Sequence, residues 1–196
     1  MNTISEQQAN VEWSKFASKF DELGLSSHYD MDKLKNEILS SPCSINEDSG
    51  TAYRGALIMH INMLMALSQR IAKMISGTFP IDENSLMKVC CIMHLAKRTM
   101  YVESENDWDI KRGYPFKFAE NEGTLRCGER SALEALNNGV KLSVSEFEAI
   151  KALDDDENNG KKAFQNIIVM VVRQANDLAY AIEKERYKKI KNSNNA

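Results

Sequence analysis

Apolar residues recur at the three- and four-residue spacing of an α-helix in several long segments of this chain. A strongly helical run covers residues 55–75, GALIMHINMLMALSQRIAKMI. Further helices are predicted at 5–23, 32–39, 82–102, 126–138, 145–153 and 161–188. Only 3 prolines and 9 glycines occur among 196 residues, too few for the many tight turns of a sandwich or barrel. The sequence therefore predicts an all-α, single-domain helical bundle of six or seven helices.

The chain is expected to divide into one domain with short additions at its ends. We predict a helical extension over 1–31, the main domain over 32–188 and a polar tail over 189–196. Residues 104–124 are aromatic, charged and interrupted by glycine and proline, so we predict a long loop or a short β-hairpin there. A loop of this length is a candidate functional segment.

Composition excludes several classes of protein. No apolar run reaches the roughly 18–20 residues that a membrane helix requires, and a net charge of −3 provides no basic field for nucleic acid. The polar N-terminus does not resemble a secretory signal. The four cysteines (Cys43, Cys90, Cys91 and Cys127) contain no CxxC pair, so we predict reduced thiols in the cytoplasm, with a thiolate metal site as the alternative.

Three polar residues inside apolar helices are candidates for chemistry. His60 and His94 each lie in a helical apolar run, and Asp177 lies between Ala175 and Leu178 in the last predicted helix. A buried imidazole needs a partner for each ring nitrogen. Each histidine is either a core residue with its own hydrogen-bond partners or a metal ligand, and Asp177 lies either at the exposed edge of its helix or against a partner. Together the three residues could form a facial triad for one divalent transition metal.

Four short motifs follow one another along the chain: GALIMH (55–60), MKVCCIMHLAKRTMYV (87–102), GERSALEAL (128–136) and QANDLA (174–179). Their order and spacing resemble the bacterial and phage branch of the HD-domain phosphohydrolases. The resemblance implies an all-α, HD-domain-like fold that holds one or two divalent metals. It also implies that a metal-bound water attacks a phosphate ester, usually of a nucleotide.

Residue by residue, the resemblance assigns His60 and His94 to the two histidine ligands and Asp177 to the final aspartate ligand. Lys97 matches the lysine that follows the HD pair. Basic side chains at or near these motifs could contact a phosphate group, and the candidates are Lys97, Arg126 and Arg130.

The chain departs from the family pattern at its central ligand. Leu95 replaces the aspartate of the HD pair, and Cys127 replaces a later histidine. Loss of one anionic ligand beside a divalent ion removes on the order of several kcal/mol of metal affinity. We therefore predict a catalytically degenerate protein without a cofactor that acts as a binding or structural subunit. It would contact a protein partner or its own copies through Trp108, Tyr114, Phe116 and Phe118.

Two alternatives remain open. One is a metal-dependent phosphohydrolase acting on nucleotides, with a single divalent metal on the reduced site. The other is a sensor that binds a nucleotide without cleaving it. Both alternatives place the protein in the cytoplasm, as does the main prediction, which also allows a virion if the chain is phage-encoded.

Overall fold

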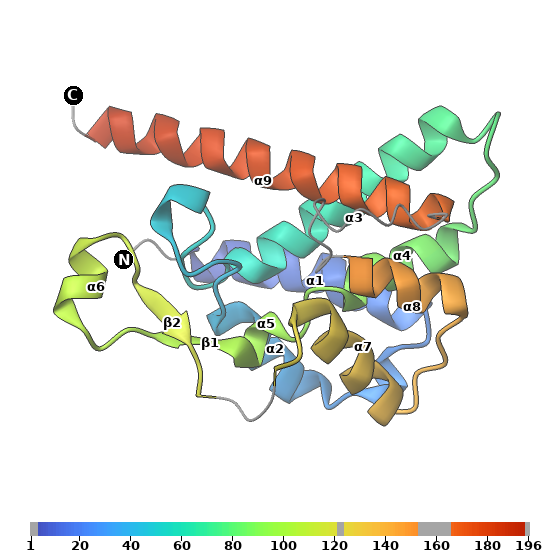
Figure 1. Ribbon diagram of the computed structural model, residues 1–196, viewed down its shortest axis with the longest axis horizontal. Coiled ribbons are helices and arrows are strands. Elements are labelled where there is room, and N and C mark those ends of the chain that lie inside the picture. The colour runs from blue at the N-terminus through green and yellow to red at the C-terminus, as the bar shows by residue number, and fades with distance from the viewer. Residues whose placement is uncertain (1–3, 121–123, 153–165, 195–196) are drawn as a thin grey trace.

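The computed structural model describes residues 4–120, 124–152 and 166–194 (Figure 1). Helices dominate, which confirms the all-α prediction, and the sheet in the described part has only two strands. The helices are α1 (Glu6–Glu22), α2 (Met31–Ser40), α3 (Ala56–Ile75), α4 (Glu83–Ile92), α5 (Lys97–Met100), α6 (Asp107–Lys111), α7 (Cys127–Asn137), α8 (Val144–Lys151) and α9 (Ile167–Asn194). None of these helices combines the length and the apolar character needed to cross a bilayer.

The core forms around α3, which packs against α9, α4 and α1. Figure 1 shows α9, in red, running across the top of the molecule over α3. Phe16 and Phe20 of α1 are fully buried in the same apolar core as the later helices. The predicted extension over 1–31 thus shares its core with the predicted domain over 32–188.

Side-chain caps fix where two of these helices start. The Asp30 carboxylate accepts a hydrogen bond from the Lys33 backbone N–H at the start of α2, two residues before the predicted start at 32. Asp82 caps α4 in the same way, as the sequence predicted. These caps satisfy N–H groups that the helix itself leaves unpaired.

The continuous helix predicted over 82–102 is wrong. α4 ends at Ile92, residues 93–96 form turns, and α5 and a short strand follow. Within the turns the backbone N–H of Leu95 bonds to the Ile92 carbonyl at 2.9 Å, and that of Lys97 to the His94 carbonyl at 3.0 Å. These three-residue spacings tighten the chain relative to an α-helix. As a result, the His94 side chain leaves the backbone in a different direction from the one it would have in a continuous α-helix.

The loop between α2 and α3 lies directly against α9, and Gly50 makes this approach feasible. Gly50 has φ +78°, and a Cβ on it would lie 2.6 Å from the Glu183 carbonyl oxygen. Any side chain would therefore push the loop away from α9. The loop is also closed on itself, since the Cys43 N–H bonds to the Thr51 carbonyl at 3.0 Å.

Residues 101–118 form a small lobe that we call the arm, at the left of Figure 1. Strands β1 (Tyr101–Glu103) and β2 (Phe116–Phe118) pair antiparallel, with Tyr101 opposite Phe118, and α6 connects them. The hairpin therefore begins at Tyr101, three residues before the predicted segment 104–124, and its connection contains a helix. Residues 121–123 of the predicted segment lie outside the described residues.

The last helix also differs in its bounds from the prediction. Residues 161–165 of the predicted helix lie outside the described residues, and α9 continues through 189–194, where a polar tail was predicted. Apolar residues of α9 line its inner face, including Val172, Ala175 and Ala179.

Candidate functional site

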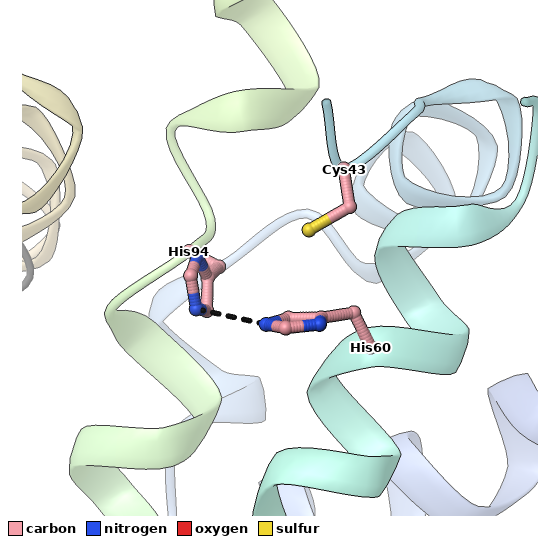
Figure 2. Close-up of side chains that lie close together, drawn as sticks. All are labelled: Cys43, His60 and His94. Carbon is pink, nitrogen blue, oxygen red and sulfur yellow. Dashed lines mark hydrogen bonds between the residues drawn. The ribbon is translucent and has the colours of Figure 1, made fainter. Parts of the chain in front are cut away.

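His60 and His94 meet in the interior, as Figure 2 shows. His60 lies on α3 and His94 in the turn after α4, and both side chains are fully buried. Their Nε2 atoms are 3.2 Å apart, and the rings meet edge to face with centroids 4.7 Å apart. The pairing that the sequence suggested is therefore present.

The third polar group is Asn176, not Asp177. Asp177 is exposed on the outer side of α9, whereas Asn176 is buried. The Asn176 Oδ1 atom lies 3.1 Å from His60 Nε2 and 2.9 Å from His94 Nε2. Adjacent residues on a helix point about 100° apart, so the prediction of Asp177 missed the inner face by one position.

Glu183, about two turns further along α9 than Asn176, contacts His60 from the other side. Its Oε2 atom lies 2.9 Å from His60 Nδ1 in the interior. A carboxylate accepts hydrogen bonds, so His60 Nδ1 carries the proton and its N–H group donates a hydrogen bond to Glu183. In the neutral ring the Nε2 atom then presents a lone pair toward His94 and Asn176.

Lys97 lies inside the protein, so it does not present its charge at the surface to a phosphate. Its ammonium donates to the Cys43 carbonyl at 2.8 Å and to the Tyr180 hydroxyl at 2.6 Å. The Cys43 Sγ atom lies 3.5 Å from the same ammonium and 3.4 Å from the Tyr180 hydroxyl. The Tyr180 ring also stacks against His60, with centroids 4.3 Å apart. Through Tyr180, the side chains of Lys97 and Cys43 are connected to the two histidines, and together they form one polar centre.

We use the term centre for Cys43, His60, His94, Lys97, Asn176, Tyr180 and Glu183 together. Burial, the nearby Lys97 ammonium and the His60 ring hold the pKa of His94 well below its usual value, so this imidazole is neutral at pH 7. Burial also raises the pKa of the Cys43 thiol and that of the Tyr180 hydroxyl, so both retain their protons. The hydrogen bonds from the Lys97 ammonium to the Cys43 carbonyl and the Tyr180 hydroxyl reduce the cost of burying this group.

One atom of the centre lacks a partner. His94 Nδ1 is buried and has no hydrogen-bond partner within the part of the chain that the structure describes. An unpaired ring nitrogen costs free energy relative to its state in water. The centre is thus not optimised for packing alone.

The remaining predicted site residues lie elsewhere. Arg126 and Arg130 lie at the start of α7, where the Arg130 side chain donates to the Leu125 carbonyl at 2.8 Å. In the arm, Trp108 and Phe118 are 60% and 58% exposed, whereas Phe116 is only 2% exposed. Tyr114 is half-buried. The four predicted interface residues therefore separate into an exposed pair and an inner pair.

Sequence reasoning missed Asn176, Tyr180 and Glu183, and it included Cys43 only among the four cysteines of an alternative thiolate site. Helical spacing could have found two of them, because Asn176 follows Val172 by four residues and Glu183 follows Ala179 by four, and both earlier residues are buried. Cys43 lies in a loop, where no periodicity marks its orientation.

The carboxylate-rich metal shell of the HD-domain family does not fit these residues. Leu95 occupies the position after His94 and is buried in the apolar core. The inner residue of α9 at this level is an amide and not a carboxylate. Two imidazoles and one amide remain directed at a common point, with a thiol beside them. No family model, curated protein or solved structure matches the chain.

Proposed function

We propose that this chain is a catalytically degenerate, HD-domain-like helical protein that acts by binding or as a structural subunit. The observation that carries this proposal is the closed centre. Its two histidines are fully buried, Glu183 bonds to His60 Nδ1, and Asn176 lies against both Nε2 atoms. Buried Leu95 stands where the family pattern has the carboxylate that catalysis would need. A hydrolase needs an open coordination position and a path for substrate.

The arm is the surface that we propose for binding. Trp108 and Phe118 expose large rings, and the Arg112 guanidinium lies 4.2 Å from the Trp108 ring centroid. Exposed aromatic and arginine side chains are the residue types most enriched at protein interfaces. The partner in this proposal is a protein, either another copy of this chain or a different one, in the cytoplasm or in a virion.

A turnover screen tests the proposal. The full chain is incubated separately with Mg²⁺, Mn²⁺, Co²⁺, Ni²⁺ and Zn²⁺ and with nucleoside mono-, di- and triphosphates and a generic phosphoester. We expect no phosphate release above that of a His60→Ala, His94→Ala double variant. Release that requires both histidines would overturn the proposal and favour the metal-dependent phosphohydrolase.

One observation supports that second candidate. The His60 and His94 Nε2 atoms converge to 3.2 Å, a separation that two ligands of one metal ion also adopt. Titration calorimetry with nucleotides separates both functions from a nucleotide sensor, which would bind nucleotide without releasing phosphate.

A further inference from the structure

We propose that Cys43, His60, His94 and Asn176 form a buried site for one thiophilic transition-metal ion of the zinc class. This site is not the carboxylate site that the HD-domain resemblance implies. It lacks both aspartates and takes a thiol from the loop that precedes the first motif. It needs no catalytic activity, and it stands whether or not the arm binds a partner.

The contacts among three inner side-chain atoms, one each from His60, His94 and Asn176, favour a site for a central cation. His60 Nε2, His94 Nε2 and Asn176 Oδ1 form a triangle with sides of 3.2, 3.1 and 2.9 Å. A ring nitrogen and an amide terminus each act here either as donor or as acceptor. Each of the three atoms is either a hydrogen-bond donor or an acceptor, so at least two of them have the same role. The contact between those two atoms then brings two lone pairs, or two N–H groups, against each other. A cation at the middle removes this conflict, because all three atoms then present lone pairs to it.

Glu183 already prepares His60 for such an ion. The Nδ1–H group donates to the carboxylate at 2.9 Å, which fixes the ring and leaves Nε2 unprotonated on the inner side. Histidine ligands in metal sites typically make this contact with a carboxylate, which orients the ring and raises its basicity. Glu183 contacts His60 on the side of the ring away from the three converging atoms. This position of a carboxylate behind a histidine is a second observation that supports a metal site.

Cys43 supplies the fourth donor. The Cys43 Sγ atom and one ring nitrogen each of His60 and His94 lie within 4.8 Å of one another. Figure 2 shows the Cys43 side chain directed toward the two imidazoles. In a tetrahedral zinc site the sulfur and nitrogen donors are roughly 3.5 Å apart, given Zn–S and Zn–N bonds of about 2.3 and 2.1 Å. An inward movement of Sγ by about 1 Å is therefore sufficient to complete the site.

The surroundings accommodate a thiolate. Metal binding transfers the Cys43 thiol proton to solvent and forms one S–metal bond, with no change of oxidation state. The Lys97 ammonium, 3.5 Å from the sulfur, can donate a hydrogen bond to the thiolate. The thiolate and the Glu183 carboxylate offset the two charges of the ion. Sulfur and imidazole donors prefer Zn²⁺ and Co²⁺ over Mg²⁺ and Mn²⁺.

Cobalt substitution tests this site directly. The full chain is stripped with a chelator and titrated with Co²⁺ and then with Zn²⁺ under reducing conditions. We expect one Co²⁺ per chain, visible bands of tetrahedral intensity and a near-ultraviolet sulfur-to-cobalt charge-transfer band. One equivalent of Zn²⁺ should abolish these bands, and excess Mg²⁺ should not.

Two variants assign the donors. Cys43→Ser should lose the charge-transfer band and bind Zn²⁺ at least ten-fold more weakly, whereas Cys127→Ser should retain both properties. Asn176→Leu should weaken binding while keeping the charge-transfer band. If Cys43→Ser fails to fold, a Cys90→Ser, Cys91→Ser, Cys127→Ser triple variant, in which Cys43 is the remaining cysteine, replaces it and should retain the charge-transfer band.

Two results would overturn the proposal. One is less than about a tenth of an equivalent of tightly held Co²⁺ or Zn²⁺ per folded chain. The other is a cobalt spectrum without sulfur character, or one that Cys43→Ser leaves unchanged. Neither result bears on phosphate release, so failure of this site and failure of the proposed function are separate outcomes.

Discussion

The centre and the arm depart from the usual distribution of residues in opposite ways. The centre places two histidines, a lysine, a glutamate and an asparagine where apolar side chains normally pack, whereas the arm exposes Trp108 and Phe118 to solvent. In the centre, each polar group depends on partners from other helices. In the arm, the exposed rings contribute little to folding and remain available for contact. The two regions should therefore respond very differently to substitution.

The largest effect is expected where the centre meets the apolar core. Leu95→Asp places a carboxylate in the buried position that the HD-domain family reserves for one, but without a paired cation. We expect the free energy of unfolding to fall by about 4 kcal/mol or more in the metal-free protein. Urea unfolding measures this, with Leu95→Asn as a matched uncharged control that should cost less. A loss no larger than that of the asparagine control would contradict the expectation of an uncompensated buried charge.

Glu183→Gln should have the next largest effect. The substitution keeps the size of the side chain but removes the negative charge of the group that accepts the hydrogen bond from His60 Nδ1. We therefore expect the free energy of unfolding to fall by about 2 kcal/mol. Glu185→Gln, two residues along the same helix and exposed, is the matched control and should leave stability unchanged. Equal effects of the two substitutions would show that the buried contact does not contribute.

The centre should also make stability depend on pH. Burial lowers the pKa of His94 in the folded protein, so below the unfolded value of about 6.5 the unfolded chain binds a proton that the folded chain excludes. The stabilisation is present above that pH and is lost as the pH falls, by up to about 1.4 kcal/mol per pH unit. Urea unfolding of the chelator-treated protein between pH 7.5 and 5.5 measures the slope. His94→Gln should flatten it, His28→Gln should not, and an unchanged slope in His94→Gln would refute this origin.

The smallest effect on stability is expected in the arm. A Trp108→Ala, Phe118→Ala double variant should change the free energy of unfolding by no more than about 0.5 kcal/mol, because both rings are mostly exposed. The same variant should abolish any concentration-dependent rise in mass that light scattering detects for the unmodified chain. A large loss of stability would show that the rings pack within the fold and would remove the contrast with the centre.

Periodicity predicted the helices well because burial repeats regularly along them. The run at 55–75 matches α3 almost residue for residue, and the segments at 126–138 and 145–153 correspond to α7 and α8. The break at 93–96 contains neither glycine nor proline, so no local signal marks it. Tertiary contacts decide that break, among them the 3.0 Å hydrogen bond from the Ala96 N–H to the Ser131 hydroxyl of α7.

The candidate site could be predicted only in part. Two histidines in apolar helices signalled a buried polar cluster, and the structure brings them together. The choice of Asp177 over Asn176 favoured charge over helical position, although the position determines which side chain reaches the interior. Cys43 depends on how a loop lies against α9, which the sequence does not encode at short range.

The order in which the centre can assemble affects how long the folded protein persists. Asn176 and Glu183 come from α9, and they contact residues that lie 82 to 123 positions earlier in the chain. Contacts of such large sequence separation require the longest loops to close, so we expect them to form after the folding transition state. Interactions that form late mainly slow unfolding and have little influence on the folding rate. The contacts of the centre should therefore lower the unfolding rate, and an ion bound there would lengthen the lifetime of the native state.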